Sequence, residues 1–155
     1  MEEAPVALAG PEERNPDGLL RPLLADLLRG GTPVRLEVTG HSMTPFIRSG
    51  DVVTLEPPEG RRLALGEVVA LAPGGRLLVH RLVGWDRGRA LCRGDVAAGA
   101  DPPVSPDDLL GRVTRVERGG RRVRLGLGIE RLPIAWLSRV GLLRALARLR
   151  ERIRP

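Results

Sequence analysis

The sequence predicts a mainly β fold with flanking helices. Its middle part alternates short β-rich runs with turns that contain glycine, proline or aspartate, and no helical pattern lies between those runs. Apolar residues return at helical spacing only near the two ends of the chain. The 155 residues, 42% of them apolar and 28% charged, are enough for one domain with a sizeable core.

The N-terminal part is predicted to be a disordered leader followed by a short helix. Residues 1–16 are rich in Ala, Pro and Glu, a composition typical of disorder. Residues 17–31 carry leucines at helical spacing, and Gly30 and Gly31 would end the helix. Pro22 lies early in this segment, where the first turn of a helix tolerates proline.

Residues 32–128 are predicted to form the β domain. Residues 34–38 alternate apolar and charged side chains, which is the period of a half-buried strand. Further β-rich runs follow at residues 52–55, 67–71, 77–82, 90–93 and 113–116. Short strands separated by glycine turns indicate an antiparallel β barrel or a folded antiparallel sheet.

Residues 129–155 are predicted to form a basic amphipathic helix. Its apolar face would consist of Ala135, Leu142, Leu146, Leu149 and Ile153. Residues 112–155 hold 13 arginines against 3 acidic residues, whereas residues 1–111 hold 12 arginines against 16. A basic helix with a tryptophan, Trp136, at one end can lie on an anionic membrane, so peripheral membrane contact through residues 132–155 is one expectation. Packing of the same face on the protein's own core is the alternative.

The composition excludes several kinds of chemistry. All 25 basic residues are arginine, so no mechanism can use a lysine base, a lysine Schiff base or the lysine of a P-loop. The single cysteine, Cys92, cannot form an internal disulfide. Two histidines and one cysteine argue against a zinc site, and we expect no metal and no cofactor.

Neither a transmembrane helix nor an export signal is expected. No run of 18 apolar residues exists, and the first residues carry acids where a secretory signal carries positive charge. We therefore expect a cytoplasmic protein or one peripheral at the membrane. Nucleic acid is not an expected partner, because Phe46, Trp85 and Trp136 leave little aromatic surface for base stacking.

Ser42 and His80 are candidates for nucleophilic chemistry. Ser42 follows a predicted strand, and Gly40 allows a tight turn that presents a hydroxyl together with backbone N–H groups. His80 shares one face of an otherwise apolar strand with leucines, and an imidazole accepts protons at neutral pH. His41 is adjacent to Ser42 and would point away from its hydroxyl, so His80 is the better base. A loop serine and a core histidine are the structural alternatives.

A third group must orient the imidazole of such a pair. Asp95 and Asp101 flank a loop of small residues, and either carboxylate could serve. Both aspartates also stand in ordinary turn pairs, Gly-Asp and Asp-Pro.

Together these motifs resemble a known superfamily. They run in order through residues 33–117 as Gly40-x-Ser42-Met43-x-Pro45, Gly50-Asp51-x-Val53, Gly66-Glu67-Val68-Val69, His80-Arg81, Gly94-Asp95, Asp101 and Gly111-Arg112-Val113. This series resembles the type I signal peptidases and the self-cleaving SOS repressors. Most of those proteins use a lysine base. Histidine at the matching strand position resembles the Ser-His-Asp branch, the archaeal and endoplasmic-reticulum signal peptidases.

The resemblance implies a role for each of these residues. Ser42 would be the nucleophile, His80 the general base, and Asp101 the group that holds the imidazole. Asp95 would support the loop or share that role. Met43 and Pro45 would contact substrate.

The resemblance also implies a fold and an activity. The fold would be a signal-peptidase-like core of coiled antiparallel β-sheet. The protein would be a serine endopeptidase that cleaves a peptide or protein substrate after a small residue. A non-catalytic peptide-binding module on the same fold is the alternative.

Overall fold

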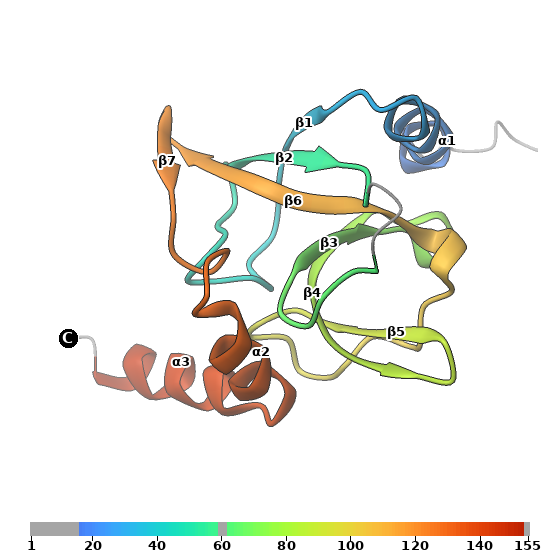
Figure 1. The fold of residues 1–155 in the computed structure, drawn as a ribbon. Coiled ribbons are helices and arrows are strands. Elements are labelled where there is room, and N and C mark those ends of the chain that lie inside the picture. Colours follow the sequence, from blue (N-terminus) through green and yellow to red (C-terminus); the bar gives the residue numbers. More distant parts are fainter. Residues whose placement is uncertain (1–15, 59–61, 154–155) are drawn as a thin grey trace, which may run out of the picture.

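A computed structural model describes residues 16–58 and 62–153 (Figure 1). The predicted leader lies outside the described residues, except for Pro16, at which the first helix begins. The mainly β prediction is confirmed: within the described residues, one seven-stranded antiparallel sheet is accompanied by three α-helices.

The strands follow one another along the chain without an intervening α-helix. They are β1 (Val34–Glu37), β2 (Val52–Glu56), β3 (Val68–Leu71), β4 (Leu78–Asp86), β5 (Arg89–Arg93), β6 (Leu109–Arg118) and β7 (Arg121–Val123). Their order in the sheet is β1-β2-β6-β3-β4-β5, and β7 forms a hairpin with β6. The barrel alternative is wrong: β1 and β5 are the two ends of the path, so the sheet stays open.

The sheet curls because its ladders contain register shifts. One shift lies between Thr54 and Leu55 in β2, and another between Ala70 and Leu71 in β3. Such irregularities bend a strand and increase its twist. The resulting curvature carries β4 and β5 away from β1 and β2 (Figure 1).

Two apolar cores lie on opposite faces of β3. Val68 and Ala70 belong to the larger core, which also contains Leu24 and Leu28 of helix α1 (Pro16–Arg29). Val69 and Leu71 belong to the second core, together with residues of β4 and β5. Because β3 is buried on both faces, its sequence is continuously apolar rather than alternating.

The C-terminal segment differs from the single predicted helix. It forms α2 (Arg131–Arg139) and α3 (Leu142–Ile153), separated at Gly141. Gly141 has a φ of +77°, a left-handed conformation that ends a helix and that side chains rarely adopt. Because of this break, Ala135 and the leucines of α3 do not share one helix face: Ala135 is buried in α2, whereas Leu142, Leu146 and Leu149 are exposed. The side chain of Ile153 lies outside the described residues.

Two short 3₁₀ helices, η1 (Pro73–Gly75) and η2 (Pro106–Asp108), connect strands. Among the described helices, none is long and apolar enough to cross a membrane.

Candidate active site

Ser42 lies in a turn that the fold anchors at both ends. Backbone hydrogen bonds join Val38 to Gly50 and Asp51, which closes the loop between β1 and β2. Within the loop, Gly40 adopts a φ of +94°, and the N–H of Ile47 donates to the carbonyl of Met43. Met43 and Ile47 point into the larger core and are almost fully buried. Their burial fixes the turn that presents the Ser42 hydroxyl.

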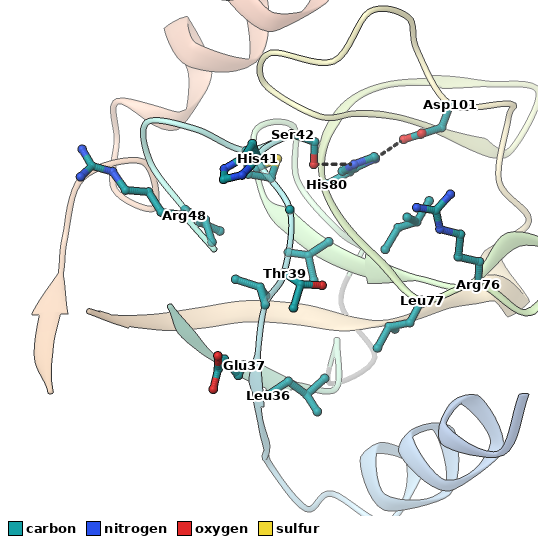
Figure 2. Close-up of a pocket in the computed structure, with 16 residues that line it drawn as sticks. Leu36, Glu37, Thr39, His41, Ser42, Arg48, Arg76, Leu77, His80 and Asp101 are labelled. Atoms are coloured by element: carbon teal, nitrogen blue, oxygen red, sulfur yellow. Dashed lines mark hydrogen bonds and ion pairs between the residues drawn. The ribbon is translucent and has the colours of Figure 1, made fainter. Parts of the chain in front are cut away.

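His80 lies on β4, opposite Val69 of β3, and is buried. Its Nε2 atom is 3.1 Å from Ser42 Oγ, and its Nδ1 atom is 2.6 Å from Asp101 Oδ2. Figure 2 shows the three side chains in a line, with the imidazole between the hydroxyl and the carboxylate. With its proton on Nδ1, the imidazole donates to Asp101 and leaves Nε2 free to accept the proton of Ser42.

Asp101 reaches His80 from the loop that follows β5. Its backbone N–H donates to the carbonyl of Cys92 at 3.0 Å, which ties this loop to the strand. Its carboxylate is 15% exposed, so solvent reaches it only in part. The structure therefore brings together Ser42, His80 and Asp101, which lie 38 and 21 residues apart along the chain.

Asp95 is engaged by Arg81 instead of His80. Arg81 Nε donates to Asp95 Oδ1 and Arg81 Nη2 to Asp95 Oδ2, both at 2.8 Å, and neither side chain is exposed. Arg81 Nη1 also donates to the carbonyls of Gly66 and Gly126 at 2.9 Å. Of the two aspartates that the sequence left open, Asp101 is the one in contact with the imidazole.

The segment that contains Asp95 nevertheless supports the serine. The N–H of Val96 donates to the carbonyl of Ser42 at 2.9 Å. A Cβ atom at Gly94 would lie 2.7 Å from Ser42 Cβ, so only glycine fits there. Sequence reasoning missed Arg81 as the residue that holds this segment. The available signal was a charged residue next to His80 within an apolar strand.

A cleft of about 650 Å³ opens beside Ser42 and His80 (Figure 2). Met43 is among the residues that line this cleft, whereas Pro45 is exposed and is not. The walls of the cleft come from β1 with its extension and from the start of β4, and no sequence motif marked them. The wall residues are Leu36, Glu37, Val38, Thr39, Arg76, Leu77, Leu78 and Val79.

An ion pair between Asp51 and Arg118 stabilises the end of the loop that carries Ser42. Burial raises the pKa of the Asp51 carboxyl, but hydrogen bonds from the Arg118 side chain and the Arg48 backbone N–H, helped by the charges of both residues, outweigh it. The pKa of Asp51 therefore lies below its ordinary value, and the carboxylate stays ionised between β2 and β6.

Cys92 is no second nucleophile for this cleft. Burial, reinforced by the charge of Asp101, raises the pKa of the Cys92 thiol to about 12, and a neutral thiol is a poor nucleophile. Within residues 16–58 and 62–153, no three His, Cys, Asp or Glu side chains gather in a way that could hold a metal ion.

One family model matches the chain, and its description is Peptidase S24-like. The match covers residues 15–92, about half of the 155-residue sequence, and includes Ser42 and His80. A search of curated proteins finds no match. The open antiparallel sheet agrees with this assignment, which supports the resemblance to the superfamily of signal peptidases and SOS repressors. The chain therefore belongs to the Peptidase S24-like family.

Proposed function

We propose that the protein is a serine endopeptidase that uses Ser42, His80 and Asp101. The observation that carries this proposal is the position of the His80 imidazole, which contacts Ser42 Oγ through one nitrogen and Asp101 through the other. A histidine that only completes hydrogen bonds in the core would not need a serine hydroxyl beside its second nitrogen. In this protein that nitrogen faces the cleft and contacts Ser42 Oγ. This arrangement favours the Ser-His-Asp branch of the superfamily over the lysine-based branches.

The reaction begins when Ser42 Oγ attacks the carbonyl carbon of the scissile peptide bond. His80 Nε2 takes the serine proton, and Asp101 stabilises the imidazolium that forms. Backbone N–H groups of the Ser42 turn stabilise the oxyanion of the tetrahedral intermediate. The imidazolium then gives its proton to the leaving amine, which breaks the C–N bond.

A second half-reaction releases the acyl group. Water attacks the ester carbonyl while His80 takes one of its protons. The same proton returns to Ser42 Oγ as the C–O bond breaks. The products are two peptides, and the enzyme is regenerated.

The cleft suits an extended peptide. Its walls are two extended segments, residues 36–39 and residues 76–79. Met43 and Ile47, whose side chains are almost fully buried, line the cleft near Ser42. The preference for a small residue before the scissile bond is what the resemblance to signal peptidases implies.

The test is cleavage of a peptide library by the full chain, alongside Ser42→Ala and a matched control, Ser49→Ala. Ser49 is exposed and lies outside the cleft lining. The wild type and Ser49→Ala should cleave at the same rate, and Ser42→Ala should show no cleavage. Binding of library peptides without cleavage by any of the three proteins would overturn the proposal in favour of a non-catalytic peptide-binding module.

A further inference from the structure

Helix α3 turns its most apolar stripe away from the protein. Leu142, Leu146 and Leu149 follow one another at intervals of four and three residues, so they share one side of the helix. They are between 43% and 55% exposed. The side that faces the protein carries partly buried Leu143, Arg144 and Ala147 instead. An amphipathic helix that served only the fold would show the reverse orientation.

Helix α2 carries a second exposed stripe. Ile134, Ala135 and Ser138 are buried and attach the helix to the body of the protein. Leu132 and Trp136 on α2 and Val140 directly after it, spaced four residues apart, are all more than half exposed. Trp136 has the largest of these side chains and is 61% exposed. Two consecutive helices thus leave leucine, valine and tryptophan uncovered.

Arginines border both stripes. Arg139, Arg148, Arg150 and Arg152 are exposed on α2 and α3. Across residues 131–153 the only acidic residue is Glu151. A surface that combines leucine and tryptophan with arginine can insert its apolar side chains below a layer of anionic headgroups and hold those headgroups with its guanidinium groups.

We infer that α2 and α3 form a binding surface for an anionic lipid bilayer, with both helices lying in the plane of the membrane interface. A second copy of the chain fits less well, because docking the two surfaces would bring like-charged arginines together. A nucleic acid would engage the arginines but would leave the leucine stripes exposed to water. The bilayer satisfies both features at once.

The same helices hold the loop that carries Asp101. Arg144 Nη1 donates to the carbonyl of Ala98 at 3.2 Å, and Arg93 Nη1 donates to the carbonyl of Arg139 at 3.3 Å. In Figure 1, α2 and α3 lie together at the end of the molecule away from α1. Membrane binding would therefore hold the loop of the candidate active site near the lipid surface. That consequence rests on the proposed function, whereas lipid binding itself does not.

The experiment is co-sedimentation of the full chain with vesicles of three parts phosphatidylcholine to one part phosphatidylglycerol, or of phosphatidylcholine alone. We expect binding to the anionic vesicles at low salt, loss of that binding at high salt, and little binding to phosphatidylcholine. Replacing two surface arginines, Arg148→Gln with Arg152→Gln, should weaken binding about 30-fold, since each arginine near an anionic surface contributes about 1 kcal/mol. The control pair Arg87→Gln with Arg89→Gln removes the same charge from the exposed end of the β4–β5 hairpin and should not weaken binding.

A second double variant, Leu146→Gln with Leu149→Gln, tests the contribution of the apolar stripe to vesicle binding. Its control is Leu23→Gln with Leu65→Gln, which replaces two exposed leucines elsewhere on the protein. Only the first pair should abolish sedimentation with vesicles. The fluorescence of Trp136 gives a second measurement of membrane insertion that does not need the leucine variants. In Trp85→Phe, Trp136 is the single tryptophan, and its emission should shift to the blue with anionic vesicles.

Several results would overturn the inference. They are absence of vesicle binding at low salt, equal binding to both kinds of vesicle, unshifted Trp136 emission, and equal loss of binding in the control pairs. Formation of a dimer that Leu146→Gln with Leu149→Gln disrupts, without vesicle binding, would assign the surface to a second copy of the chain. Since no readout involves cleavage, failure here is distinguishable from failure of the proposed function.

Discussion

Arg81 and Asp95 form a bidentate ion pair that is fully shielded from solvent. Arg81 neighbours His80 on β4, and Asp95 lies in the segment whose backbone supports Ser42. The pair therefore joins the strand of the candidate base to the turn of the candidate nucleophile. It does so without touching either reacting atom.

Breaking this ion pair should strongly destabilise the protein. Asp95→Asn leaves a buried guanidinium without its counter-charge, and loss of one partner of a buried pair costs about 3–5 kcal/mol. Chemical denaturation of the wild type and the variant measures the difference in the free energy of unfolding. The double variant Arg81→Met with Asp95→Leu should lose less stability than Asp95→Asn, because no unpaired charge stays buried. A loss below about 0.5 kcal/mol in Asp95→Asn would show that the pair does not stabilise the fold.

Asp101→Asn should lower kcat without unfolding the protein. The amide no longer selects the imidazole tautomer that accepts the serine proton, and a change of this kind costs about 10⁴-fold in kcat in serine peptidases. Steady-state cleavage of a soluble peptide measures kcat and KM. Asp107→Asn, an exposed aspartate of η2, is the matched control and should behave as the wild type. An unchanged kcat in Asp101→Asn would remove Asp101 from the mechanism.

A methyl group at Gly94 should displace Ser42. Because the added Cβ would lie 2.7 Å from Ser42 Cβ, Gly94→Ala must shift the serine relative to His80. A displacement of about 1 Å can cost about 100-fold in rate. Gly99→Ala is the control in the same loop, since its Cβ would meet nothing within 4 Å. Equal rates for the two alanine variants would contradict the close packing of Gly94 on Ser42.

Asp51 should make the stability of the protein depend on pH in the acid range. The pKa of its carboxyl is lower in the folded protein than its ordinary value of 3.8, so the folded state binds this proton less tightly than the unfolded chain does. The stabilisation is therefore complete above pH 3.8 and is lost as pH falls through the lowered value. Asp51→Asn should be less stable at neutral pH and should show a flatter dependence on pH in acid. Parallel stability profiles for variant and wild type would contradict this assignment.

Cys92 should stay unmodified in the folded protein. With a thiol pKa of about 12, the thiolate fraction at neutral pH is negligible, and the side chain is fully buried. Iodoacetamide should leave both the mass and the proposed peptidase activity of the native protein unchanged, yet alkylate one site in denaturant. Rapid alkylation of the native protein, with loss of activity, would mean that the cysteine is reactive.

The strands were predictable wherever local pattern decides the structure. The alternation at residues 34–38 and the apolar run before Leu71 correspond to β1 and β3. The hairpin strand β7 was missed, because its sequence Arg121-Arg122-Val123 carries too little apolar character to be read as a strand. A barrel closes only if the two edge strands pair with each other. The pattern of apolar residues within one strand does not show whether that pairing forms, so the sequence did not distinguish a barrel from an open sheet.

The residues of the candidate site could be predicted from the sequence, but which of them contact one another could be predicted only in part. The turn at Gly40 and the isolated imidazole of His80 were visible in the sequence. Which aspartate faces His80 was not, because the answer depends on Arg81, which pairs with Asp95 and leaves Asp101 for the imidazole. The break at Gly141 was missed for a related reason: apolar spacing alone does not reveal a residue with positive φ.

The most direct test of the central claim is to locate the covalent bond formed by a fluorophosphonate probe. Trypsin cleaves after arginine, so Ser42 falls in the peptide of residues 36–48 and Ser49 in the next one, residues 49–61. Mass spectrometry of the labelled, digested protein should find the adduct on Ser42 of the first peptide, and labelling should fall sharply in His80→Asn. An unlabelled protein, or an adduct on any other residue, would contradict the account.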